Sequence, residues 1–402
     1  MMNSFKPNEG IIPDFSPYIQ MQELIANLSK KNIVHTLSEI LSSKFANKSE
    51  EVPHLINAIL YIIKFRPNQI CVYAELVKKL LEYNNEYYQL TEFRTILIKS
   101  IINVLSSSCP FPENTSIAYF LYQLIEHEIL TFREFIAISS LYNSDTLIST
   151  KSKKWLFCLF GPEIEDCNED FYLELKSLFK FKDENSFLQR IFQPYFDELE
   201  ELKENNWYLF KKRRGYDFDP YSITSIIEHD QLTYFSHMAK GSTFDLNQRI
   251  ESSIFARSDF QQHRPTLIQY AALCGSVKCF RFLLQHHAKI DIPDETNRPF
   301  SDFLAMSNHS TIANYLFTLN ISIKNALHLA IQFHYNELFF KLRVISPKKY
   351  HCAIKTVIIL CKRRYFVIIY TFSKIYIRKD GKSMKVIKME IQHFMQLLFM
   401  VI

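Results

Sequence analysis

Apolar side chains recur at intervals of three and four residues through most of the first half of the chain. The pattern is clearest over residues 55–63, 76–83 and 96–105, where leucine and isoleucine line one side of a helical wheel. Residues three and four apart share one face of an α-helix, so this spacing predicts helices with one buried side. We therefore predict a helical domain over residues 18–214, preceded by a flexible N-terminus over residues 1–17.

Local signals subdivide this helical region. Thr131 stands three residues before Glu134 at the start of an apolar run, a spacing typical of a capping box. Proline and glycine at 109–112 and 160–162 predict turns. Residues 187–212 contain an acidic middle and a basic end, and we predict that they form one long helix.

The hydrophobic pattern changes at about residue 219, where short apolar stretches begin to alternate with polar turns. Residues 266–275 read TLIQYAALCG, and residues 276–284 read SVKCFRFLL. This pattern predicts a helix that ends at a left-handed Gly275, followed by a second helix packed on the first. The polar run PDETNRP over residues 293–299 then predicts a long turn.

These residues resemble the ankyrin repeat, a unit of about 33 residues with the pattern T-P-L-H-x-A-A, a glycine, and a second helix ending in L-L. Residues 266–284 follow this pattern, with Leu267 in place of the proline and Gln269 in place of the histidine. Residues 325–342 resemble a second unit. Residues 298–316 resemble a degenerate unit between the two.

A further degenerate unit precedes them over residues 223–247, so the resemblance to ankyrin repeats spans residues 220–345. It implies an all-α chain in which an N-terminal helical domain is followed by a short ankyrin-repeat solenoid. Neighbouring units of such a stack share one apolar interior. The whole arrangement resembles a large group of ankyrin proteins expanded in flagellated protozoa, in which a helical domain of unknown function precedes the repeats.

The resemblance implies roles for individual residues. Positions that shape the repeat are Thr266, Ala271, Gly275, Leu283, Leu284, His328 and Ala330. Ankyrin stacks bind proteins through a concave face made by the turns between units, called fingers, and by the first helices. Contact with a partner is therefore implied for Gln269, Asp294, Glu295, Thr296, Asn297, Arg298 and Ser301.

The tail over residues 346–402 has lost the register of the repeats. Read in a shifted frame, any codons for residues 388–396 give a sequence that fits D-G-N-T-A-F-H-A-A, the start of another ankyrin unit. We therefore expect this atypical tail to come from a frameshift in a longer ankyrin gene. The coding DNA checks the idea, because a stop codon in the shifted frame within a few residues on either side would rule it out.

Composition narrows the class further. Only 6 of 402 residues are glycine, which disfavours hairpin-rich sheets and phosphate-binding loops. The N-terminus lacks the apolar run of a signal peptide, and no apolar run reaches the roughly 18 residues of a membrane span. The eight cysteines show no C-x-x-C spacing and are expected to be free thiols. We therefore expect an intracellular chain, cytoplasmic or nuclear.

The common motifs of phosphate binding, zinc proteases and serine hydrolases are missing from the sequence, so we expect no enzymatic activity and no cofactor. The group Cys274, Cys279, His286 and His287 lacks the short spacing of zinc ligands, and we interpret it as core thiols beside a helix end. The KKRR run over residues 211–214 is interpreted as the solvated end of a helix. Its alternative is a nuclear-localisation or nucleic-acid patch.

The sequence thus favours a non-catalytic scaffold or adaptor that binds an unknown protein partner through the concave face of ankyrin repeats. No small-molecule substrate is evident, and the net charge of +5 is small for a nucleic-acid partner. Two alternatives stay open. One is a basic nucleic-acid-associated adaptor that uses residues 211–214, and the other is an enzyme of unrecognised type in the N-terminal helical domain.

Overall fold

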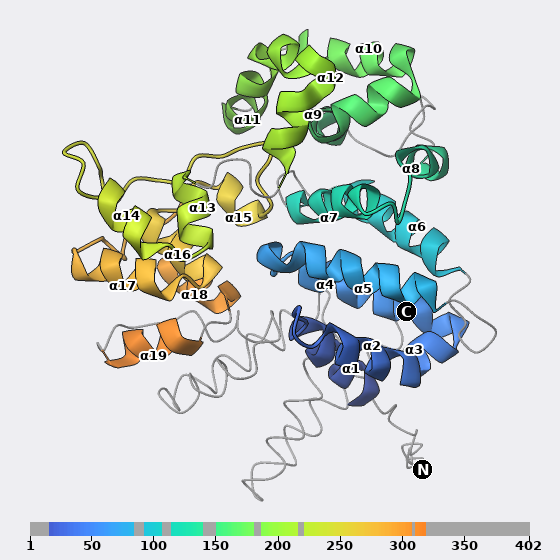
Figure 1. The fold of residues 1–402 in the computed structure, drawn as a ribbon, viewed down its shortest axis with the longest axis horizontal. Coiled ribbons are helices and arrows are strands. Elements are labelled where there is room, and N and C mark those ends of the chain that lie inside the picture. The colour runs from blue at the N-terminus through green and yellow to red at the C-terminus, as the bar shows by residue number, and fades with distance from the viewer. Residues whose placement is uncertain are drawn as a thin grey trace, which may run out of the picture. The chain divides into compact units, whose positions relative to one another are not determined.

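The computed structural model of the chain describes residues 16–83, 92–106, 114–139, 150–180, 186–215, 221–307 and 310–318. These residues are mostly helical, which confirms the predicted class (Figure 1). No β-strand forms among them, and one isolated β-bridge pairs Arg249 with Thr266. Within the same residues, no helix has both the length and the apolar character that crossing a bilayer requires.

The chain divides into two compact units. The first is Leu24–Leu342 and holds all the helices from α2 onward. The second combines Met1–Glu23 with Arg343–Ile402, and the structure describes residues 16–23 of it, within α1 (Ser16–Ala26). The predicted flexible N-terminus and the predicted frameshifted tail lie almost wholly outside the described residues.

In the first part of the large unit, helices pack both on their neighbours, as α9 does on α10 and α2 on α3, and on helices further along the chain. Thus α5 lies against α2 and α7, α7 against α9, α4 against α6, and α6 against α8. The bounds are α2 (Ile33–Ser42), α3 (Lys44–Asn47), η1 (Ser49–Glu51), α4 (Val52–Ile63), η2 (Pro67–Gln69), α5 (Ile70–Glu82), α6 (Phe93–Ser106), α7 (Thr115–Glu126), α8 (Phe132–Ser139), α9 (Thr150–Cys167), α10 (Glu169–Ser177), η3 (Leu178–Lys180), α11 (Ser186–Asp197) and α12 (Leu199–Arg214).

The apolar faces predicted for these helices form the core. Leu55, Ile56, Ile59 and Ile63 of α4 are wholly buried, as the three-and-four spacing requires. The predicted capping box at the start of α8 is also present. The Thr131 amide donates to Glu134 Oε2 (2.7 Å), and the Glu134 amide donates to Thr131 Oγ1 (3.2 Å).

The single helix predicted over residues 187–212 is wrong. The structure has two helices, α11 and α12, and α12 itself is interrupted at Asn205, Asn206 and Trp207, which have φ angles of 52°, 59° and 61°. Asparagine tolerates this left-handed conformation, whereas tryptophan does so rarely. Trp207 is held there because its side chain is buried and its indole N–H donates to Glu165 Oε2 (2.7 Å).

At the turn predicted over residues 160–162, two helical segments of α9 meet at a kink. The backbone leaves the helical region at Phe160 (φ −124°, ψ 24°), two residues before Pro162, which cannot donate a backbone hydrogen bond. Gly161 lets Trp207 approach, because a Cβ at this position would lie 3.1 Å from the tryptophan Cη2. The turn predicted at 109–112 lies outside the described residues.

From Ile223 onward, the described residues of the large unit contain three helix pairs in two rows, together with the short helix α15. The first helices of the pairs, α13, α16 and α18, lie side by side, and the second helices, α14, α17 and α19, form the neighbouring row (Figure 1). The bounds are α13 (Ile223–Glu228), α14 (Leu232–Met238), α15 (Asp259–Gln262), α16 (Leu267–Cys274), α17 (Val277–Gln285), α18 (Phe300–Ser307) and α19 (Ser310–Thr318).

Apolar side chains fill the space between successive pairs. The rings of Phe235 and Phe282 lie 5.6 Å apart, and those of Phe280 and Phe300 lie 5.8 Å apart. One polar contact also joins two pairs. Asp230 Oδ1 accepts the amides of Lys278 and Cys279 (both 2.9 Å), so a carboxylate from the first pair caps a helix of the second.

Candidate functional site

The helix pair α16–α17 begins with a complete capping box. Thr266 Oγ1 accepts the Gln269 amide (3.5 Å), and Gln269 Oε1 accepts the Thr266 amide (2.8 Å). The first helix ends at Gly275, whose φ of 73° and ψ of 25° are left-handed. This confirms the predicted stop, which lets the chain reverse into α17.

Substitution of Gly275 should therefore destabilise the whole chain. A valine at this position strains the backbone, and we expect Gly275→Val to lower the free energy of unfolding by about 1–3 kcal/mol. Gly275→Asn is the matched control, because asparagine tolerates positive φ, and it should cost less than half as much. The measurement is urea unfolding of the full chain followed by circular dichroism. Equal stability of the valine variant and the wild type would contradict the left-handed stop.

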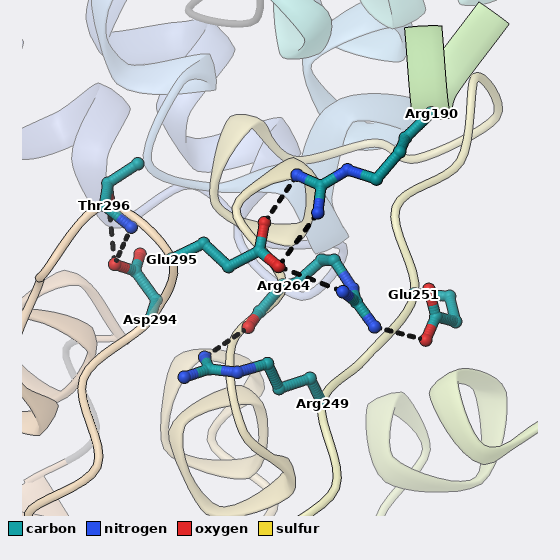
Figure 2. A network of polar contacts seen from close by, with 7 residues as sticks. All are labelled: Arg190, Arg249, Glu251, Arg264, Asp294, Glu295 and Thr296. Carbon is teal, nitrogen blue, oxygen red and sulfur yellow. Dashed lines mark hydrogen bonds and ion pairs between the residues drawn. The ribbon is translucent and has the colours of Figure 1, made fainter. Parts of the chain in front are cut away.

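After α17 the chain forms a finger over residues 288–299, which we call the second finger (Figure 2). Asp294 organises its tip, because Oδ1 accepts the Thr296 amide, the Thr296 hydroxyl and the Arg298 amide, all at 2.8 Å. Asp294 is 2% exposed, so it shapes the finger and does not present its carboxylate to solvent. Asn297 takes a left-handed φ of 62° and completes the turn.

The expectation that Gln269 faces solvent is wrong, because its side chain is wholly buried. Besides closing the capping box, its amide nitrogen donates to the carbonyls of Ile292 (3.0 Å) and Arg298 (3.4 Å). Gln269 thus ties α16 to the second finger. It takes the position where the repeat pattern has histidine, and its two-ended amide lets it serve both the helix start and the finger.

Glu295 forms the centre of an ionic network at the finger tip (Figure 2). Its carboxylate accepts two bonds from Arg190 of α11 (3.1 and 2.7 Å) and one from Arg264 (2.9 Å), which also pairs with Glu251 (2.6 Å). Partial burial raises the pKa of Glu295, but the hydrogen bonds and charges of Arg190 and Arg264 outweigh it and hold the pKa below its usual value. Glu295 therefore binds within the chain already.

The remaining residues predicted from the repeat pattern divide into exposed and enclosed positions. Thr296 and Asn297 are exposed at the tip, so they are accessible to a partner. Arg298 is half-buried with its guanidinium 5.0 Å above the Phe260 ring, and Ser301 Oγ lies 3.2 Å from Asp302 Oδ1. Partner contact by these residues stays a prediction.

Most of the positions expected to shape the repeat lie among the described residues, and there they are buried or half-buried within the repeat. Ala271 and Leu283 are wholly buried between the helix pairs, and Leu284 is half-buried. His328 and Ala330, together with the unit predicted over residues 325–342, lie outside the described residues.

A feature that the sequence did not predict follows the first finger (residues 240–249). The second finger leads directly into α18, whereas the first is separated from α16 by residues 251–265, which we call the plug segment. Its two ends meet: the Ile250 amide donates to the Pro265 carbonyl (2.8 Å), and Arg249 pairs with Thr266 in the β-bridge. Arg249 also donates to the Arg264 carbonyl (2.9 Å). The plug segment is therefore an insertion whose two ends are held together, and it leaves the first finger intact.

One side of the plug segment contacts the N-terminal helices. Asp259 of α15 lies at the start of α7, where its Oδ1 accepts the Ser116 amide (3.3 Å). The Phe255 ring meets Phe210 of α12 (centroids 5.5 Å), and the Arg257 guanidinium lies 5.5 Å from the Tyr119 ring of α7.

The other side of the plug segment covers the first helices of the repeat-like pairs. Arg257 pairs with Glu228 of α13 at 3.5 Å, and the Phe260 ring meets Phe303 of α18 at 6.4 Å. Every residue of α16 from Leu267 to Leu273 is buried, so this inner helix presents no open face. The face from which we predicted partner binding is thus covered at α16 by the chain itself.

The basic run over residues 211–214 is partly engaged in ion pairs within the chain. Arg214 is 3% exposed and makes two bonds to Glu163 (2.9 and 2.6 Å), while Arg213 pairs with Glu198. Lys211 and Lys212 remain exposed. Since Arg213 and Arg214 have carboxylate partners, the run makes a weak phosphate-binding patch.

The thiol and imidazole group does not form a ligand set. Burial raises the pKa of Cys279 to about 12 and the pKa of Cys274 well above its usual value, so neither thiol is poised as a thiolate. His286 stacks on Phe282 with ring centroids 4.0 Å apart, and His287 has a left-handed φ of 64° in the position where the repeat pattern has glycine. Within the described residues, no three metal-ligating side chains converge.

A cleft of about 400 Å³ opens between α11, α12, α13 and the plug segment. Its charged lining consists largely of ion pairs, Arg213 with Glu198 and Arg257 with Glu228.

The helix pair, the left-handed glycine and the polar finger define a repeat of the ankyrin class. Residues 266–295 match the family model of the ankyrin repeat, so the chain carries such a repeat over α16, α17 and the second finger. No curated protein matches this chain. Ankyrin repeats are interaction modules and typically lack catalytic activity, which points to a protein partner.

Proposed function

We propose that the protein is a non-catalytic scaffold or adaptor that binds a protein partner through its ankyrin-type units. The observation that carries the proposal is the second finger, a rigid polar turn whose core is held by Asp294 and Gln269 while Thr296 and Asn297 face outward. Such a preorganised polar tip suits recognition of a protein surface, because little conformational entropy is lost on binding.

The finger tips are the contact surface that this proposal favours, since the inner helix α16 is covered. The two fingers act together, because the Lys289 amide donates to Asn247 Oδ1 (2.8 Å) and joins the second finger to the first. The proposal includes a cytoplasmic or nuclear location, and a relationship to the protozoan ankyrin proteins in which a helical domain precedes the repeats.

The test uses the full chain as bait with proteins of its own cell, quantified by mass spectrometry. The double variant Lys289→Glu/Asn297→Asp changes two exposed finger positions and should reduce capture of specific partners at least five-fold. Lys99→Glu is the control, because it makes the same charge reversal as Lys289→Glu at an exposed position on α6. Equal capture by both variants and the wild type would contradict finger-mediated binding.

A further inference from the structure

The surface under the plug segment has the character of a peptide-binding site. It combines an aromatic ring, Phe303, with a carboxylate, Glu228, and a guanidinium, Arg298, on elements that belong to three successive pairs. We call these residues, with Tyr270, the inner-face patch. Phe303 is wholly buried and Tyr270 is 2% exposed, so the patch is apolar at its centre and charged at its edges.

The plug segment fills this patch as a bound peptide would. Its Phe260 ring lies between the Phe303 ring (6.4 Å) and the Arg298 guanidinium (5.0 Å), and Arg257 reaches Glu228 (3.5 Å). A backbone bond from the Glu295 amide to the His263 carbonyl (3.1 Å) fixes its end. An arginine followed three residues later by an aromatic residue is thus the pattern that the patch accepts.

The plug segment is built so that it can leave without unravelling the stack. Its ends are joined by the Ile250–Pro265 bond and the Arg249–Thr266 bridge, and neither of these contacts involves residues 251–264. Its one helix, α15, has 4 residues, and its internal backbone bonds are local, such as Gln261 to Ser258 and His263 to Phe260. Burial also raises the pKa of Asp259 to about 7, so near neutral pH its ionisation weakens the closed state.

We propose that the inner-face patch is a second binding surface, occupied by the plug segment in the closed protein and opened to a partner segment that carries arginine and, three residues later, phenylalanine or tyrosine. This inference rests on the proposed function as a protein-binding chain. The plug segment acts as an internal competitor, and an incoming segment replaces the Arg257–Glu228 pair and the Phe260 contacts with its own.

The test supplies the plug segment in trans. In an otherwise full-length chain, residues 251–264 are replaced by an Asn-Gly turn, which suits a two-residue connection between Ile250 and Pro265. A fluorescein-labelled peptide of residues 251–265 should bind this variant saturably and at least ten-fold more tightly than it binds the wild type. Peptides with Arg257→Ala or Phe260→Ala should bind the variant at least ten-fold more weakly than the native peptide.

The matched control peptide carries Glu251→Gln, since this side chain is 77% exposed and pairs with Arg264 of the plug segment itself. It should bind within two-fold of the native peptide. A folded variant that binds no peptide, or binds all four peptides equally, overturns the proposal. Because no outside partner is used, this failure is distinct from failure of the finger variants to alter capture.

If the shortened chain does not fold, hydrogen exchange on the unmodified protein tests whether the plug segment opens locally. Displacement requires local opening, so amides of residues 254–263 should be at least ten-fold less protected than those of α16. Equal protection of both segments would show that the plug segment opens only with global unfolding, which overturns the proposal.

Discussion

Replacing Arg214 by alanine should lower the free energy of unfolding by about 3–5 kcal/mol, because the change leaves Glu163 without its buried partner. The guanidinium makes two bonds to Glu163 and a third to the Leu159 carbonyl (2.7 Å), and it stacks 4.3 Å from the Tyr122 ring. Lysine cannot reproduce this planar, bidentate arrangement, so Arg214→Lys should also destabilise the chain.

The neighbouring Arg213 provides the matched control for this prediction. Its pair with Glu198 is more open, with the two side chains 29% and 45% exposed. Such pairs contribute about 0–1 kcal/mol, so Arg213→Ala should have a small effect in the same urea titration. Equal losses for the two variants would mean that Arg214 is not buried as described. The contrast also separates a structural role of the basic run from a role in binding.

Asp259 should make a contribution to stability that falls as pH rises from about 4 to about 7, opposed by His263, whose burial lowers its pKa to about 4 and makes its own contribution rise over the same range. Burial raises the pKa of this carboxyl from its usual 3.8 to about 7, against the lowering effects of Lys64 and of hydrogen bonds from Ser116 and Thr115. The folded chain therefore keeps a proton that the unfolded chain has released. The contribution is complete below pH 4 and is lost by pH 7, and it amounts to up to about 4 kcal/mol.

The variant Asp259→Asn isolates this effect. Asparagine keeps an acceptor for the Ser116 amide and carries no charge, so the difference in stability between the variant and the wild type should grow as pH rises from 4 to 7. At pH 8 the variant should be more stable than the wild type by about 2–4 kcal/mol, and near pH 4 the two should be similar. The measurement is urea unfolding at half-unit steps between pH 4 and 8. Parallel curves for the two proteins would exclude Asp259 as the source of the dependence.

The parts of the fold that follow from local sequence were predictable. The buried faces of α4 and α5, the capping box at Thr131 and the left-handed Gly275 each depend on residues within a few positions of one another. The interruption of α12 depends on partners far along the chain. Its Trp207 is held by Glu165 and fits over Gly161, and the spacing of apolar residues around position 207 does not reveal either contact.

The candidate site also contains features that local sequence predicts and features that depend on distant partners. The finger was predicted from its polar run, but the burial of Gln269 was not, because the resemblance to the repeat implied partner contact by Gln269 itself. The T-x-x-Q spacing at Thr266 is a capping-box signature and would have predicted the bond from the Thr266 amide to Gln269 Oε1. The plug segment has no periodicity of its own. Its position depends on side-chain contacts such as Asp259 with the Ser116 amide, which lies 143 residues away in sequence.

A covered inner helix changes what an ankyrin-type unit can do. With α16 enclosed, the finger tips are open in the closed protein, and the inner-face patch becomes available only when the plug segment moves. Taken together, the two proposals give the chain a permanent binding surface and a conditional one. The conditional surface depends on the contact between Phe260 and the first helices, most directly on its contact with Phe303.

The most direct test of this account is a double-mutant cycle on Phe260 and Phe303 in the full chain. The account predicts that Phe260→Ala and Phe303→Ala are each destabilising, and that their effects on the free energy of unfolding fail to add by about 0.5–1.5 kcal/mol. Strict additivity of the two changes would contradict it, because the plug segment would then not lie on the inner helices.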